Sequence, residues 1–387
     1  MENRYYHLKI TKDIEDLNID KLGDNLLYYS YHTKELFSLI NKNDKESPQF
    51  ISAYNRFRGE LFENTIYELL LQYAINNKNI TKFVLKGPHQ SLSNKDNKKF
   101  GLLMDKNRQI VYKAGYKDIS EYDAMFFTKD SVYYVESTVV QSTTGLRKRL
   151  RKKTALLQLL FPNLQVKALI ILSKGATGIN KFPPYATVWV TKSLNPMEIL
   201  NKLAMKKGYK KGKFLKYNNS KLIEAHDIKV DIFKYFDTLG WILRKGVDKN
   251  SKKINESFFL SKKIQQYIDI YSKIYIGYIL KNTLKLLLNG YSYENFSLKN
   301  IADDKYIYVS LDKGDDNSFD IIYYVKDMQK KLKKIEFING GVKISDKDPK
   351  GFTAAETRYI QYNLKKYHEL NLQEVLNITC RVKKWSI

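Results

Sequence analysis

The chain has 387 residues, of which 43% are hydrophobic and 28% charged, the composition of a folded protein rather than a disordered one. This length suffices for about two or three domains. Lys and Arg (67 residues) outnumber Asp and Glu (41), and the net charge is +26. Such a charge indicates nucleic acid as the partner, because neutralised phosphates release condensed counterions. An acidic protein partner, a membrane surface or the Lys-rich codons of an AT-rich genome could also account for it.

Several classes of protein are excluded by the same features. Cys380 is the single cysteine, so the chain has neither an intrachain disulfide framework nor a cysteine-based zinc site. The most apolar stretch, Ile270 to Leu288, is interrupted by three lysines and is too polar to span a bilayer. We do not expect the first residues to form a signal peptide. We therefore expect a cytoplasmic protein without a membrane partner.

Residues 1–55 are predicted to form a partly helical N-terminal lead-in. From Arg56 to Tyr73 apolar residues recur every three or four positions, which predicts a helix with one buried face. A short strand from Phe83 to Lys86 ends at a Gly-Pro pair. The polar segment from His89 to Lys99 follows, and loops of this length are usually functional or disordered.

A strand-rich stretch comes next, and two of its strands are separated by only three residues, which predicts a hairpin. A basic helix is predicted from Thr144 to Leu160, before Pro162. The order of elements over residues 56–194 predicts an α/β fold in which a mixed sheet is flanked by helices. The predicted strands are Gln109 to Lys113, Tyr122 to Thr128, Val132 to Val140, Val166 to Leu172 and Ala186 to Val190.

Residues 195–387 are predicted to form a basic α+β accessory region, in one piece or in two subdomains divided near residue 290. Its segment from Asn201 to Lys216 mixes lysines with Tyr209 and Phe214, as nucleic-acid surfaces do, although a Lys-rich loop is the simpler interpretation. Asp320 and Glu336 fall on two strands of a predicted β-meander. The other predicted elements are helices over Asp231 to Leu239, Phe258 to Leu288 (one or two helices) and from Thr353 onward, and strands over Tyr306 to Leu311, Phe319 to Val325 and Ile335 to Ile338.

Two carboxylates stand inside the apolar strands of the predicted hairpin. Asp123 lies within Tyr122 to Phe127, and Glu136 lies between Tyr-Tyr-Val and Val-Val segments. A charge at such a position is costly unless it is paired or binds a cation. Mg²⁺ prefers oxygen ligands, and a bound metal ion activates water for phosphodiester hydrolysis. The pair therefore predicts a Mg²⁺ site, with Mn²⁺ as a substitute.

Part of the chain resembles the PD-(D/E)XK nuclease superfamily. The resemblance rests on the two hairpin carboxylates, the Glu136-Ser137-Thr138 triplet, the helix containing Arg58 to Glu63 and the basic helix after the hairpin. This superfamily includes restriction endonucleases and Holliday-junction resolvases. The resemblance covers roughly residues 56–194, about a third of the chain, and its motif is short. It implies a restriction-endonuclease-like sheet in which Asp123, Glu136 and the Ser137 carbonyl bind the metal ion. It also implies an additional acid at Glu63, with Glu60 as the alternative.

Thr138 departs from the pattern, because the family usually has a catalytic lysine at this position. The resemblance implies that Lys148, Lys152 or Gln141 takes over that role. The basic helix, which also contains Lys153, is a candidate surface for phosphates. The predicted nucleic-acid-binding residues are Arg147, Lys148, Arg149, Arg151, Lys152, Lys207, Lys210, Lys211 and Lys213.

Each of these features also has a simpler structural interpretation. Asp123 and Glu136 could pair with lysines, Glu60 and Glu63 could complement a helix dipole, and the basic helix could be a solvated face. The function that the sequence favours is a Mg²⁺-dependent endonuclease that cuts DNA in a restriction, phage-defence or mobile-element system, as a homodimer or in a larger defence complex. An inactive DNA-binding protein with a nuclease fold and an RNA-directed nuclease are the alternatives.

Overall fold

A computed structural model divides the chain into two compact units, Met1–Phe233 and Lys234–Ile387. The structure describes residues 8–42, 44–89, 99–115, 117–205, 215, 218–248, 250–251, 253–271, 273–289, 292–293, 306–314, 318–326, 332–338, 341–345 and 368–385.

A six-stranded mixed sheet forms the centre of the first unit, with the order β8-β7-β6-β5-β1-β9. β6, β7 and β8 run parallel, and β5 runs antiparallel to its neighbours β6 and β1. The hairpin and the two later strands predicted from the sequence are confirmed, as is the mixed α/β class. The strands are β1 Lys82–Val84, β5 Ala124–Phe127, β6 Ser131–Thr138, β7 Gln165–Ser173, β8 Ala186–Thr191 and β9 Leu222–Ile223.

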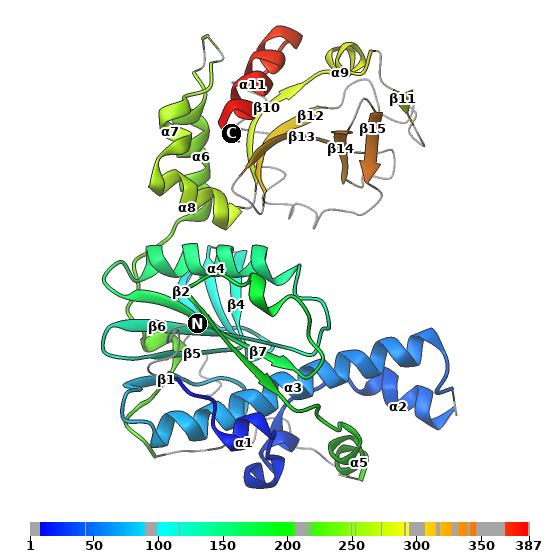
Figure 1. Ribbon diagram of the computed structural model, residues 1–387, viewed down its shortest axis with the longest axis vertical. Coiled ribbons are helices and arrows are strands. Elements are labelled where there is room, and N and C mark those ends of the chain that lie inside the picture. Colours follow the sequence, from blue (N-terminus) through cyan, green and yellow to red (C-terminus); the bar gives the residue numbers. More distant parts are fainter. Residues whose placement is uncertain are drawn as a thin grey trace. The chain divides into compact units, whose positions relative to one another are not determined.

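Helices α3 (Pro48–Asn76) and α4 (Leu146–Leu160) cover opposite faces of this sheet (Figure 1). The Tyr134 hydroxyl contacts the Thr154 hydroxyl of α4 at 2.8 Å. The neighbouring strand residues Tyr133 and Val135 belong to the core cluster that contains the apolar residues of α3. Because side chains alternate along a strand, Glu136 shares the α4 face with Tyr134.

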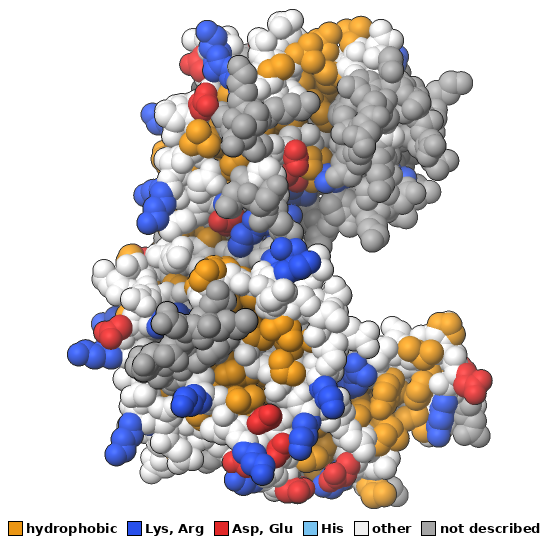
Figure 2. Space-filling model, in the orientation of Figure 1, with side chains coloured by type: hydrophobic (Ala, Val, Ile, Leu, Met, Phe, Trp, Pro, Cys, Tyr) orange, Lys and Arg blue, Asp and Glu red, His pale blue; other side chains and the backbone are white. Residues whose placement is uncertain are grey.

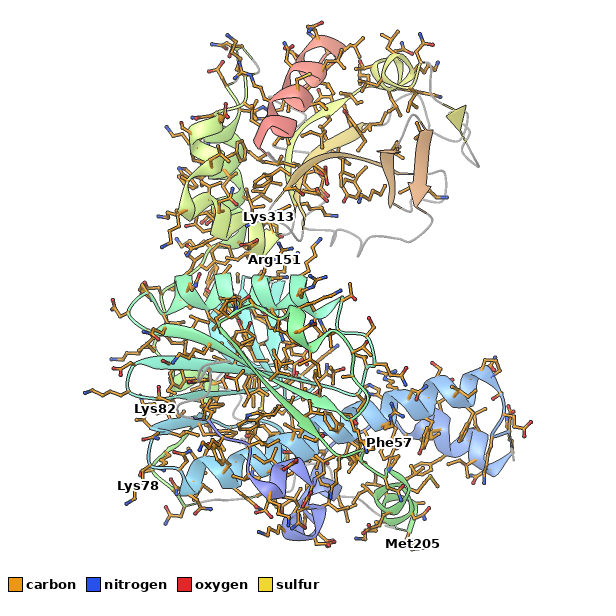
Figure 3. The ribbon with its side chains drawn as sticks, in the orientation of Figure 1. Phe57, Lys78, Lys82, Arg151, Met205 and Lys313 are labelled. Atoms are coloured by element: carbon orange, nitrogen blue, oxygen red, sulfur yellow. The ribbon has the colours of Figure 1, made fainter. Side chains whose placement is uncertain are left out.

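α3 begins eight residues before the predicted start, since Ser47 caps it by accepting a hydrogen bond from the Phe50 N–H (3.1 Å) and Pro48 follows. Its first turns project beyond the sheet together with α2 (Figure 1), and apolar side chains gather on this arm (Figure 2). Phe57, labelled in Figure 3, is fully buried against the edge of the Tyr31 ring. The remaining N-terminal helices are α1 Lys12–Glu15, η1 Ile19–Leu22, η2 Asn25–Tyr28 and α2 Lys34–Asn41.

A second, antiparallel sheet contains β2 (Phe100–Met104), β3 (Ile110–Ala114) and β4 (Lys117–Tyr122). The single strand predicted from Tyr122 to Thr128 is therefore wrong. Tyr122 ends β4 and pairs with Ile110, whereas Ala124 starts β5 and pairs with Val135 in the large sheet. Asp123 forms the bend where the chain passes from one sheet to the other. The first unit also contains η3 Gly87–His89, η4 Ile179–Lys181, α5 Met197–Met205 and η5 Ala225–Asp227.

The second unit contains a sheet in the order β10-β12-β13-β14-β15-β11. The predicted strands of the meander, which hold Asp320 and Glu336, are confirmed as β13 and β14. The helix predicted from Asp231 to Leu239 is confirmed in part as α6, which begins four residues later, at Tyr235. The elements are α6 Tyr235–Gly246, α7 Glu256–Leu260, α8 Lys262–Tyr271, β10 Lys273–Ile279, α9 Lys281–Leu287, β11 Ser292–Tyr293, β12 Ile307–Lys313, β13 Phe319–Lys326, β14 Leu332–Ile338, β15 Gly341–Ser345 and α11 Leu372–Trp385.

The helical prediction for Phe258 to Leu288 is wrong over its middle part, because β10 replaces helix there. Six of the seven β10 residues are buried, so the strand lacks the alternation of apolar and polar residues that identifies a half-buried strand. A Cβ on Gly277 would lie 2.8 Å from the His368 carbonyl oxygen, so glycine permits this close approach. The predicted helix start at Thr353 lies outside the described residues. No helix in the described part of the chain is long and apolar enough to cross a membrane.

Candidate metal-binding and catalytic site

Three strands of the first unit place the candidate residues at one end of the large sheet. Ala124 pairs with Val135, and Phe83 pairs with Phe126. The bend before β5, the last residues of β6 and the loop after β1 are therefore neighbours. Asp123, Glu136 and Lys86 occupy these three positions.

Glu136 is 4% exposed and forms an ion pair with Lys153 of α4. Lys153 is itself 9% exposed, and its Nζ lies 5.3 Å from the centre of the Tyr122 ring. Burial lowers the pKa of Lys153, and the nearby carboxylates of Asp123, Glu121 and Glu63 oppose this effect. This pair therefore lies close to the other acids.

Arg149 is a second cation beside Glu136. It lies one helical turn before Lys153, and its Nη1 is 3.9 Å from Glu136 Oε2. More than half of the Arg149 side chain is exposed, so its guanidinium is available to solvent as well as to the carboxylate. α4 therefore presents one buried and one exposed cation to this end of the sheet.

Asp123 is half-buried, and Ser137 holds its carboxylate. The Ser137 N–H and hydroxyl both donate to Asp123 Oδ2, at 2.7 and 3.0 Å. No hydrogen bond to Oδ1 is formed within the described part of the chain, so Oδ1 can accept a ligand. The metal contact expected of the Ser137 carbonyl stays a prediction.

Glu63 of α3 binds Lys86, the second lysine of the cluster. Lys86 is 1% exposed and donates from Nζ to Glu63 Oε1 (2.5 Å) and to Gln109 Oε1 (3.0 Å). Burial raises the pKa of Glu63 to about 7, with a further contribution from Asp123 and opposition from Lys86. An additional positive charge near Glu63 would therefore stabilise its ionised form.

Glu60, the alternative acid, is engaged elsewhere. It accepts hydrogen bonds from the His32 backbone N–H (2.9 Å) and from Arg56 Nε (3.3 Å), and it contacts His32 Nδ1 at 2.5 Å. These contacts fasten the N-terminal segment to α3. Of the two acids, Glu63 is the one whose electrostatic partners include Asp123.

Thr138, at the position of the usual motif lysine, uses its hydroxyl to accept a hydrogen bond from the Val140 N–H (3.3 Å). Lys148 is exposed, and Lys152 is half-buried. The lysine that reaches Glu136 is Lys153, which sequence reasoning placed only among the basic helix residues.

The sequence did hold a signal for Lys153. It lies on a buried stripe of α4 whose other members are leucines at three- and four-residue spacing, namely Leu146, Leu150, Leu157 and Leu160. A lysine at a core position of a helix requires a nearby carboxylate. Lys86 gave a similar signal, as a charge between apolar β1 residues and a Gly-Pro pair.

A largely buried network lies behind Lys86. Glu68 accepts hydrogen bonds from Tyr29 (2.7 Å) and Asn25 (3.0 Å) and contacts His89 Nε2 at 2.5 Å. Burial and the Glu68 charge raise the pKa of Tyr29 well above its usual value. Gly87 adopts a φ of +61°, and a Cβ there would collide with the Tyr29 ring. This network fixes the turn that follows Lys86.

The other predicted nucleic-acid contacts divide into two groups. On α4, Lys148 and Arg149 are exposed, and Arg147, Arg151 (labelled in Figure 3) and Lys152 are half-buried. Residues 90–98 and the four predicted contacts Lys207, Lys210, Lys211 and Lys213 lie outside the described residues.

The cluster carries more negative than positive charge. Besides Glu63, Asp123 and Glu136 it includes Glu121 of β4, whose pKa is raised by burial and then by Asp123. Four carboxylates against the cations of Lys86, Lys153 and Arg149 leave an excess of one negative charge when all are ionised.

Carboxylate oxygens are the ligand type that Mg²⁺ prefers. Within the described residues, no three Asp, Glu, His or Cys side chains already meet as metal ligands. Mg²⁺ commonly retains several waters and uses only one or two carboxylates. Asp123 and Glu136 would hold such an ion, with Glu63 next to them.

Comparison with protein-family models, curated proteins and solved structures gives no match to this chain.

Proposed function

We propose that this protein is a metal-dependent phosphodiester hydrolase acting on DNA, with a first unit of the restriction-endonuclease-like, PD-(D/E)XK type. The observation that carries the proposal is the ion pair between Lys153 and Glu136. The family usually has a lysine two residues after the strand carboxylate, where this chain has Thr138. In this chain Lys153 of α4 lies beside that carboxylate instead. The order of helix, hairpin, basic helix and parallel strands also supports the proposal.

Each residue of the cluster has a chemical task in this proposal. A bound divalent ion would supply Lewis-acid chemistry and a water of lowered pKa. Asp123 and Glu136 hold that ion, and Ser137 keeps the Asp123 carboxylate in place. Lys153 offsets negative charge on the phosphate and orients the attacking water. Lys86 keeps Glu63 beside the ion as an additional acid.

The basic surface supports nucleic acid as the substrate. The chain has a net charge of +26, and α4 exposes Lys148 and Arg149 next to the cluster. Cations near the reacting phosphate supply affinity for the strand that is independent of its sequence. A restriction, phage-defence or mobile-element system is the setting that we propose, with a homodimer or a larger complex cutting both strands.

The proposal is tested with supercoiled plasmid DNA and with matched linear DNA and RNA, in Mg²⁺ and in Mn²⁺. Asp123→Asn, Glu136→Gln and Lys153→Met should each reduce the cleavage rate by about 100-fold or more, as loss of a transition-state contact does. Lys129→Met, in the exposed hairpin turn, is the matched control and should cleave like the parent. Equal cleavage by the parent and the Glu136→Gln variant would refute the assignment. Preferential cutting of RNA would make RNA, and not DNA, the substrate.

A second candidate function is an inactive nuclease fold that only binds DNA, and Thr138 favours it. It predicts DNA binding that weakens steeply with salt and no cleavage with any divalent ion. Metal titration separates the two functions. An active site takes up Mg²⁺ in a manner that depends on Asp123 and Glu136, whereas the inactive fold shows no such dependence.

A further inference from the structure

A polar cavity of about 190 Å³ lies in the first unit beyond the carboxyl ends of the parallel strands. Val139 and Gln141 follow β6, Ser173 and Lys174 lie at the end of β7, and Ser193 and Leu194 follow β8. Arg58 of α3 completes the lining. The carboxyl edge of parallel strands is a frequent ligand site in α/β proteins.

Arg58 is the unexplained group in this cavity. Its Nε is buried and has no hydrogen-bond partner, and a buried donor without a partner costs about 1–3 kcal/mol. No described carboxylate lies within ion-pair distance of Arg58. Glu60, two residues further along α3, is occupied by His32 and Arg56. The guanidinium is therefore available for an anion from outside.

The remaining lining has the chemistry of an oxyanion site. Lys174 is exposed and brings a second positive charge, Ser173 and Ser193 bring hydroxyl donors, and Gln141 brings an amide. None of the lining residues is acidic. A guanidinium matches the geometry of a phosphate and binds it through two parallel hydrogen bonds. The volume exceeds that of one water, roughly 30 Å³, several times over, which leaves space for a phosphate group.

We infer that this Arg58–Lys174 pocket binds a phosphate of the nucleic-acid strand, beside the phosphate that is hydrolysed. Val139 comes three residues after Glu136, which corresponds to about 10 Å along an extended chain. A phosphate in the pocket is therefore different from the one at Glu136. The inference rests on the proposed function and adds a second, non-reacting contact that sets the register of the strand.

The first test measures binding in EDTA, where no cleavage takes place, by fluorescence anisotropy of labelled DNA. Arg58→Gln should weaken binding about 5- to 10-fold and lower the slope of log affinity against log salt by about one. Lys174→Gln should weaken it about 3-fold, as expected for the exposed cation, and Arg58→Lys should retain part of the affinity. Lys129→Gln, at the opposite end of the β5–β6 hairpin, should bind like the parent. Parent-like binding by Arg58→Gln, with the fold verified by circular dichroism, would overturn the inference.

The second test locates the contact on the strand. Oligonucleotides with one neutral methylphosphonate at successive positions remove one phosphate charge at a time. The parent should lose affinity at one position near the cleavage site, and Arg58→Gln should be insensitive at that position, because both changes delete the same interaction. Equal losses in the parent and in Arg58→Gln at every position would overturn the inference, even if the enzyme cleaves DNA and the proposed function stands.

Inorganic phosphate distinguishes a strand phosphate from a free one. If phosphate alone raises the melting temperature of the parent but not of Arg58→Gln, and no DNA or RNA binds, the pocket serves a small anion and the strand assignment is overturned. If nucleic acid competes with phosphate for the pocket, the strand assignment is supported. Both readouts are independent of cleavage.

Discussion

Lys153→Met removes the positive charge from a nearly buried ion pair. Glu136 is 4% exposed and Lys153 is 9% exposed, so the carboxylate would lose its close partner in a site that water reaches poorly. Breaking a buried ion pair from one side typically costs about 3–5 kcal/mol. Arg149 stays 3.9 Å from Glu136 and compensates in part, so we expect a loss of about 3 kcal/mol in the free energy of unfolding.

Urea denaturation of the protein in EDTA measures this loss. Lys148→Met on the same helix is the matched control, because Lys148 is exposed and such surface changes usually stay within about 0.5 kcal/mol. The double variant Lys153→Met/Glu136→Gln should recover most of the stability, since it removes the unpaired charge as well. Mg²⁺ should stabilise the Lys153→Met variant more than the parent, because the ion takes over the compensation of Glu136.

Two results would contradict this reasoning. If Lys153→Met is as stable as Lys148→Met, the contact with Glu136 has no energetic role. If the double variant is no more stable than Lys153→Met alone, the two side chains are not coupled. Cleavage adds a separate readout, because the double variant should stay inactive although its stability recovers.

The remaining predictions concern pH, the network behind Lys86 and the second unit. The pKa of Glu63 is about 7 in the folded protein, against a usual 4.5. The folded state therefore binds the proton of the Glu63 carboxyl group more tightly than the unfolded state does. The free energy of unfolding in EDTA should fall by about 3 kcal/mol as pH rises from 4.5 to 7. Glu63→Gln should flatten that part of a urea-denaturation profile, and an unchanged profile would contradict the assignment. Glu68→Gln should cost about 2–4 kcal/mol in a urea titration, because it breaks the wholly buried contact with His89; a loss below about 0.5 kcal/mol would show that the network is dispensable. Gly277→Ala should lower the stability of the second unit by about 1–3 kcal/mol, since its Cβ would lie 2.8 Å from the His368 carbonyl, and unchanged hydrogen exchange in β10 would refute that steric argument.

Local patterns in the sequence were sufficient for the two helices that cover the large sheet and for most of the strands of that sheet. α3, α4 and the β5–β6 hairpin were recognised because apolar spacing, a turn and a proline act over a few residues. Asp123 and Glu136 stood out for a related reason, since a carboxylate in an apolar context is costly wherever the chain folds. Glu63 was singled out by the family resemblance, with Glu60 as the alternative.

Other features depended on partners far away in the sequence. The break at Asp123 exists because Tyr122 pairs with β3 and Ala124 pairs with β6. β10 resembled a helix because nearly all of its residues are buried, which removes the period of two. In both cases the strand partner, and not the local pattern, decided the conformation.

The sequence by itself thus determined the charge of the protein, the order of the main elements in its first unit and three acids of the candidate site, Asp123, Glu136 and Glu63. Only the tertiary structure decided which cations meet those acids: Lys153 rather than Lys148 or Lys152 at Glu136, and Lys86 at Glu63. A basic helix carries many equivalent lysines, and the one that turns inward is selected by how α4 packs on the sheet. Packing is a long-range property, because it brings together side chains that are distant along the chain.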